Sequence, residues 1–73
     1  MNRLKAFRVL LGLTQQSLSA QTGIPLGRLS QIERGLVHAT ETERRLLMSV
    51  LAARQLALQE YESRMVPEGA DGS

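Results

Sequence analysis

Cysteine and tryptophan are absent from the sequence, and phenylalanine and tyrosine occur once each. Without cysteine, the chain can form neither a disulfide framework nor a thiolate metal site. With so few aromatic side chains, a core has to be built from leucine, isoleucine, valine and alanine. Hydrophobic residues supply 42% of the chain, and this composition suits a small helical domain.

Long apolar runs are also missing. No segment approaches the roughly 18 consecutive apolar residues of a transmembrane helix. Arg8 interrupts the apolar N-terminal segment where a signal peptide would have its hydrophobic core. Nothing in the sequence argues for export, so we expect a cytoplasmic protein without a membrane partner.

The sequence offers little chemistry for catalysis or metal binding. His38 is the only histidine, and it has neither a cysteine nor paired carboxylates beside it to complete a metal site. A glycine-rich phosphate loop and a pair of titratable groups, which mark many active sites, are both missing. We therefore expect no enzymatic activity, no metal and no cofactor, with His38 in contact with solvent or with a phosphate.

Size and charge limit the partners. A chain of 73 residues makes one small domain with a thin core, so a homodimer is a natural source of additional stability. Residues 1–40 contain five basic residues and one glutamate, whereas residues 41–73 contain four basic and six acidic residues. The basic first part fits a polyanionic partner such as DNA, although an ordinary solvated surface would have the same composition.

Capping residues and glycines predict two short helices at the start of the chain. Asn2 is the expected N-cap of a first helix, and Gly12 lies where a helix-ending glycine belongs. Thr14 is the expected N-cap of a second helix over residues 15–21. Gly23 lies in the following turn, where its freedom to adopt a positive φ suits a tight reversal.

Two further helices are expected after this turn. Pro25 fits the first turn of a third helix, which runs to about Arg34. Thr40 and Glu43 form the T-x-x-E capping-box pattern at the start of a fourth helix. Because residues 41–64 contain neither glycine nor proline, one long helix is the simplest interpretation of that segment.

The apolar side chains of the long helix fall in two rows, at alternating spacings of four and three. One row consists of Leu46, Val50, Ala53 and Ala57; the other, interrupted by Arg54, consists of Leu47, Leu51, Leu58, Tyr61 and Met65. One row can pack on its own domain, but two rows require a second surface. The second row is therefore either core or a dimer interface, with Arg54 at its rim or paired with an acidic residue of a partner helix. The domain is expected to span residues 1–65, followed by a disordered tail at 66–73.

The spacing of residues 15–34 matches a helix-turn-helix. Counted from Gln15, the small Ser19 falls where the two helices cross, and apolar residues fall at the buried positions: Leu18, Ile24, Leu29 and Ile32. At 100° per residue, the inward side of the third helix holds Pro25, Leu29, Ile32 and Glu33.

The residue pattern of this unit also matches a known family. With GLTQQSLSAQTGI and LSQIERG, the sequence resembles the Xre/Cro-type (lambda-repressor-like) helix-turn-helix family over about residues 3–51. The resemblance implies an all-α, lambda-repressor-like helix-turn-helix bundle of three short helices plus a long C-terminal helix. It also implies double-stranded DNA as the partner, with the third helix in the major groove.

Individual positions acquire roles from this resemblance. Base-reading candidates are Leu26, Gly27, Ser30 and Gln31, together with Arg28, which could reach guanine or a phosphate. DNA-backbone candidates are Thr14, Gln15, Gln16, Arg34 and His38. The resemblance further pairs Arg8 with Glu33, and the place of Glu33 beside the core face favours a buried structural pair over a solvated one.

The connector after the third helix departs from the family pattern. Many members carry lysine or arginine there, whereas this chain has Leu36, Val37, His38 and Ala39, followed by two glutamates within four residues. Fewer cations near the DNA backbone mean weaker binding per subunit.

Two functions are compatible with these observations. The first is a sequence-specific DNA-binding transcriptional regulator, a dimeric repressor of bacterial or phage type. The alternative is a helix-turn-helix domain repurposed for protein–protein interaction through Leu36, Val37 or the long helix, such as a small phage factor or an antitoxin that binds a host protein.

Overall fold

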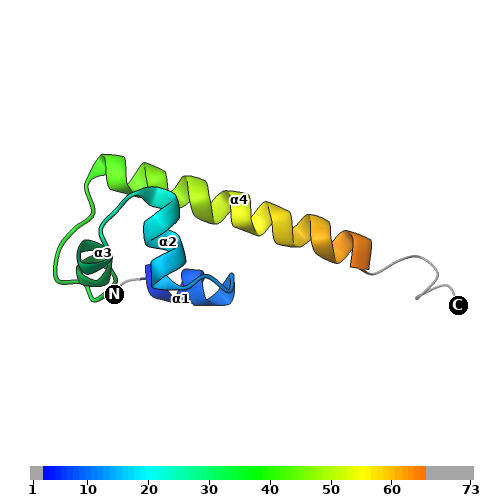
Figure 1. Cartoon of the computed structure of the whole chain (residues 1–73), viewed down its shortest axis with the longest axis horizontal. Helices are drawn as coiled ribbons and strands as arrows, with labels where there is room; N and C mark the ends of the chain where they lie inside the picture. Colours follow the sequence, from blue (N-terminus) through cyan, green and yellow to red (C-terminus); the bar gives the residue numbers. More distant parts are fainter. Residues whose placement is uncertain (1–2, 66–73) are drawn as a thin grey trace, which may run out of the picture.

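The computed structural model describes residues 3–65 of the chain, and Figure 1 shows their arrangement. Four helices make up this part: α1 Leu4–Leu10, α2 Gln15–Thr22, α3 Leu26–Glu33 and α4 Glu41–Met65. The described residues contain no strand, which confirms the predicted all-α bundle of three short helices and one long helix. Asn2, the Met65 side chain and the tail at residues 66–73 lie outside the described part.

Local signals form the predicted ends of α2 and the predicted start of α4, whereas the residue that precedes α1 is Arg3, without a side-chain cap. Thr14 Oγ1 accepts a hydrogen bond from the Ser17 N–H at 3.0 Å and thereby caps α2. Gly23 follows α2 with φ +79°, a conformation that glycine adopts without strain. At α4, the Thr40 N–H donates to Glu43 Oε1 at 2.8 Å, and the Glu43 N–H donates to Thr40 Oγ1 at 3.1 Å. The predicted capping box is therefore present.

The core is aliphatic, as the composition requires. Leu18 of α2 and Leu29 of α3 are fully buried, so the helix-turn-helix pair meets through leucine side chains. The other buried hydrophobic residues of the described part are Leu11, Leu13, Ile24, Ile32, Leu47 and Leu51. Truncation of a fully buried leucine to alanine typically costs about 2–5 kcal/mol, so this small set of residues dominates the packing energy of the domain.

The two halves of α4 have different surroundings. The first half packs on the short helices, whereas the later turns extend beyond them (Figure 1). Leu47 and Leu51 are only 4% and 2% exposed because they face the core of their own chain. These two candidates are therefore core residues of this fold. Leu58 is half-buried against the same core, while Tyr61 is 61% exposed.

Three details differ from the sequence-based expectations. Pro25 is exposed, because it precedes the first turn of α3 and does not share that helix's inward side. On α2, Thr22 is buried although the sequence did not indicate it, while Ser19, expected at the helix crossing, is half-buried. The exposed Arg54 donates from Nε to the Leu11 carbonyl at 3.1 Å, a contact with the end of α1 that the sequence did not indicate.

No helix within residues 3–65 combines the length and the hydropathy that crossing a membrane requires.

Candidate nucleic-acid interface

Side-chain hydrogen bonds fix the turn between α2 and α3. Ser19 Oγ donates to the Ile24 carbonyl, and Thr22 Oγ1 donates to the Leu18 carbonyl at 2.7 Å. The same Thr22 hydroxyl oxygen accepts from the Ile24 N–H at 3.2 Å. Since both hydroxyl groups bond to backbone atoms beside the turn, the direction in which α3 leaves α2 is set by local chemistry.

The outward side of α3 holds most of the residues expected to read bases. Leu26, Gly27 and Gln31 are exposed, and Ser30 is half-buried. Arg34, a DNA-backbone candidate, is exposed directly after α3. Within residues 3–65, no hydrogen bond involves the Gln31 side chain. A carboxamide with both its donor and its acceptor free can pair with an adenine edge, so Gln31 is the side chain on this face best suited to direct readout.

Gly27 leaves an open position in the middle of this face. Its backbone is ordinary α-helix, without the positive φ that demands glycine. A Cβ added there would meet no atom within 4 Å. The fold does not require glycine at position 27. The lack of a side chain there affects only the outer surface of α3.

Arg28 has partners within its own chain. Its Nε donates to Glu43 Oε2 at 2.9 Å, and its Nη2 donates to Glu43 Oε1 at 2.9 Å and to the His38 carbonyl at 3.2 Å. Hydrogen bonds from Arg28 lower the pKa of Glu43 to about 2, and the same contact raises the pKa of Arg28. Arg28 therefore links α3 to α4, and a DNA contact would have to compete with Glu43 for the guanidinium group.

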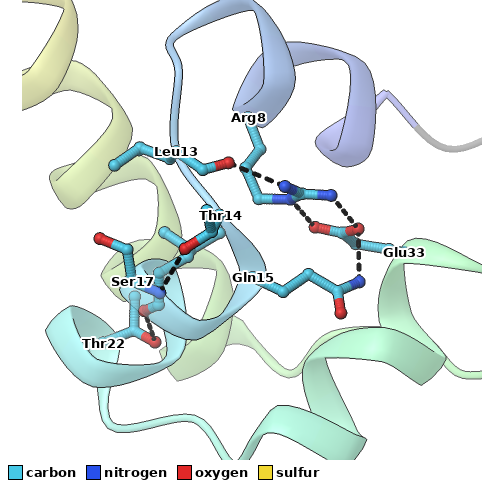
Figure 2. A network of polar contacts seen from close by, with 8 residues as sticks. Arg8, Leu13, Thr14, Gln15, Ser17, Thr22 and Glu33 are labelled. Carbon is cyan, nitrogen blue, oxygen red and sulfur yellow. Dashed lines mark hydrogen bonds and ion pairs between the residues drawn. The ribbon is translucent and has the colours of Figure 1, made fainter.

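Arg8 and Glu33 form the expected pair between α1 and α3 (Figure 2). Arg8 Nε donates to Glu33 Oε2 at 2.6 Å, Arg8 Nη2 donates to Oε1 at 3.1 Å, and Arg8 Nη1 reaches the Leu13 carbonyl at 2.8 Å. Burial alone would raise the pKa of Glu33, but hydrogen bonds from Arg8 and Gln15 outweigh it and leave this pKa below its ordinary value. The carboxylate thus stays charged in the interior because its partners are fixed around it.

Gln15 has a role that sequence reasoning missed. Its Nε2 donates to Glu33 Oε1 at 2.9 Å, which joins the start of α2 to the Arg8–Glu33 pair (Figure 2). No local pattern could indicate this bond or the Arg28–Glu43 pair, because the partners are 18 and 15 residues apart. The one weak signal for the Arg28–Glu43 pair was Glu43 itself, which the capping box placed at the start of α4.

The remaining backbone candidates lie on the surface. Thr14, Gln16, Arg34 and His38 are all exposed. The first N–H groups of a helix have no acceptor within that helix and attract anions, and the Thr14 cap satisfies only the one on Ser17. The start of α2 therefore presents donors on the surface, while the end of α3 presents Arg34.

Among residues 3–65, no group of three histidine, cysteine or acidic side chains is placed to hold a metal ion. The described surface is instead that of a helix-turn-helix with one exposed helix face.

Comparison with known proteins agrees with this architecture. A family model described as helix-turn-helix matches residues 4–52, which span α1, α2, α3 and the first half of α4. Neither the curated proteins nor the solved structures gave a match to the chain. The matched segment covers well over half of the sequence and includes the whole α2–α3 unit, and the chain belongs to the Xre/lambda-repressor-like helix-turn-helix family.

Proposed function

We propose that this protein is a sequence-specific DNA-binding transcriptional regulator that places α3 in the major groove. The observation that supports this role most directly is the exposed α3 face, where the Gln31 side chain forms no hydrogen bond within the described residues. The fixed α2–α3 turn supports it further, because a reading helix must be held rigidly against the groove.

Direct readout by this face is sparse. Gln31 suits an adenine edge, Ser30 suits almost any base, and Leu26 can contact only a thymine methyl group. Gly27 lets the α3 backbone approach the base pairs closely. We infer that sequence-dependent DNA shape supplies part of the specificity, because few side chains are present to supply it directly.

We further propose that the protein binds DNA as a homodimer and acts as a cytoplasmic repressor of bacterial or phage type. The later turns of α4 project from the bundle, and Tyr61 lies in the same row as the half-buried Leu58. In helix-turn-helix dimers the two reading helices enter successive major grooves roughly 34 Å apart, and a dimer formed through these rows has to place its two α3 helices at that separation. Occupation of a promoter by such a dimer is the simplest mode of repression.

The α4 interface can be tested with two exposed apolar residues on opposite sides of the helix. Tyr61 and Leu56 are 61% and 57% exposed, and five residues at 100° each place them about 140° apart on α4. If the Tyr61 row forms the dimer, Tyr61→Glu should give a monomer in equilibrium sedimentation, while Leu56→Glu should leave the dimer intact. Equal behaviour of both variants would remove this row from the interface.

Specific binding can be tested by selecting duplexes from a randomised DNA pool and measuring the enriched sequence by fluorescence anisotropy against competitor DNA. The wild-type chain should prefer the enriched duplex and lose affinity steeply with salt. Gln31→Ala should relax preference at one base pair by about 1–3 kcal/mol, whereas Gln59→Ala, an exposed glutamine far along α4, should change nothing. Equal affinity of the wild-type chain for every duplex would contradict the proposal.

A second function has one observation in its favour. Leu26 at the start of α3 is 41% exposed, and Leu36 in the connector after α3 is 61% exposed. Apolar side chains are therefore exposed at both ends of the proposed reading helix. Such exposure suits a helix-turn-helix domain that binds a host protein, as a small phage factor or an antitoxin would. DNA binding that is weak, indifferent to sequence and insensitive to salt would favour this role over the first.

A further inference from the structure

Three arginines from separate elements line one hollow on the surface. The hollow has a volume of about 940 Å³ and lies between the start of α1, the end of α3 and the start of α4. Its charged lining consists of Arg3, Arg34 and Arg44, with Glu33 on the inner side and His38 from the connector. These segments gather at the same end of the molecule in Figure 1.

The single carboxylate in this lining does not neutralise the arginines. The Glu33 side chain is 1% exposed and is bound by Arg8 and Gln15. The two acidic residues that follow the connector also have other partners, because Glu43 pairs with Arg28 and Glu41 lies 3.6 Å from Arg45. None of the ion pairs formed within residues 3–65 involves Arg3, Arg34 or Arg44. The hollow therefore presents three positive charges without a negative charge to compensate them.

This hollow is continuous with the proposed reading face. Arg34 lies on the same outward side of α3 as Gly27 and Gln31, and it also lines the hollow. The eight residues of α3 extend over ~12 Å at 1.5 Å per residue, about the width of the major groove. A helix of that length docked in the groove has a DNA strand close to its end, which is where the three arginines lie.

We propose that the hollow formed by Arg3, Arg34 and Arg44 binds a backbone phosphate of the DNA on which α3 docks. The inference rests on the proposed function and adds a DNA-backbone contact from α1 and α4 to it. Guanidinium groups from three elements suit a phosphate, which accepts several charge-assisted hydrogen bonds at once. They also supply the cations that the apolar connector of Leu36 and Val37 lacks.

The test compares two neighbouring arginines on α4. Arg44 lines the hollow, whereas Arg45 is directed elsewhere, with its side chain 80% exposed beside Glu41. Arg44→Gln and Arg45→Gln each remove one positive charge from almost the same place, so long-range electrostatics affect both alike. Loss of one phosphate contact lowers the slope of log K against log salt by about 0.9. We expect that loss for Arg44→Gln and Arg3→Gln, equally on specific and non-specific duplexes, and no loss for Arg45→Gln.

The outcomes separate this inference from the function on which it rests. Circular dichroism of each variant establishes that the domain is folded before DNA is added. If the wild-type chain discriminates between duplexes but Arg44→Gln and Arg3→Gln keep its salt slope, the phosphate site is wrong and the DNA-binding function stands. If the wild-type chain shows no salt-dependent DNA binding, the function itself fails. A change of base preference in Arg44→Gln without a change of slope would also overturn the phosphate site.

Discussion

Two arginine–glutamate pairs attach α3 to the rest of the bundle, and they differ in how much solvent reaches them. The Arg8–Glu33 pair joins α1 to α3, with its side chains 10% and 1% exposed. The Arg28–Glu43 pair joins α3 to α4, with its side chains 32% and 18% exposed. The charges of the Arg8–Glu33 pair are fixed in place, because separation would leave them unpaired in the interior. In the Arg28–Glu43 pair, solvent and counterions can replace either partner. The Arg8–Glu33 pair is a structural element, whereas Arg28 can leave Glu43 to contact a ligand.

The largest expected effect comes from breaking the buried pair on one side. Arg8→Met leaves the Glu33 carboxylate buried without its main partner, and we expect the free energy of unfolding to fall by about 3–5 kcal/mol. A loss of that size approaches the whole stability of a small domain. Urea unfolding followed by circular dichroism measures it.

The control for that variant removes both charges together. Arg8→Met combined with Glu33→Met leaves no uncompensated charge in the interior, so most of the lost stability should return. If the single variant were as stable as the double variant, the pair would be no more structural than an exposed one, and the contrast between the two pairs would disappear.

An effect on binding is expected from the exposed pair. Glu43→Gln keeps a capping-box side chain at the start of α4 but removes the negative charge that holds Arg28. We expect DNA affinity to rise by up to about tenfold with a steeper salt dependence, because Arg28 becomes available to a phosphate or a guanine. Arg28→Ala should remove this gain when combined with Glu43→Gln. Unchanged affinity in Glu43→Gln would mean that Arg28 serves only to link α3 to α4.

The smallest expected effect is a dependence of stability on acid. Glu43 has a folded-state pKa of about 2 against an ordinary value of 4.5, and the pKa of Glu33 is also lowered. A lowered folded-state pKa contributes stability that is present above the ordinary value and is lost as the pH falls toward the folded-state value. The urea midpoint should therefore decline from pH 4.5 to about 2. Glu43→Gln should flatten part of this decline, and an unaltered profile would remove Glu43 as its source.

The parts of this structure that could be predicted from the sequence are those with a local cause. The Thr14 cap, the Gly23 turn and the capping box of Thr40 and Glu43 each depend on residues within four positions of one another. The spacing of buried leucines and isoleucines in α2 and α3 likewise follows from helix geometry alone. These signals, together with a recognisable motif, were sufficient for the fold.

The partners of charged and amide side chains could not be predicted in the same way. Arg28 was expected to face DNA, but its partner depends on where the connector brings Glu43. Gln15 was expected at a phosphate, but its amide reaches Glu33 across the α2–α3 crossing. On α4, the repeat of apolar residues does not indicate whether the same chain or a second one covers them, so the sequence placed the buried Leu47 and the exposed Tyr61 in one row.

Under the proposed function, position 27 is where the DNA specificity of this protein is open to change. Gly27 is the second residue of α3, and nothing in the described structure requires glycine there. Replacement by a longer polar residue would add a side chain to the proposed reading face next to Gln31 without a packing clash. If α3 reads DNA as proposed, the chain is a natural starting point for regulators with new operators, because position 27 can be changed without disturbing the fold that presents it.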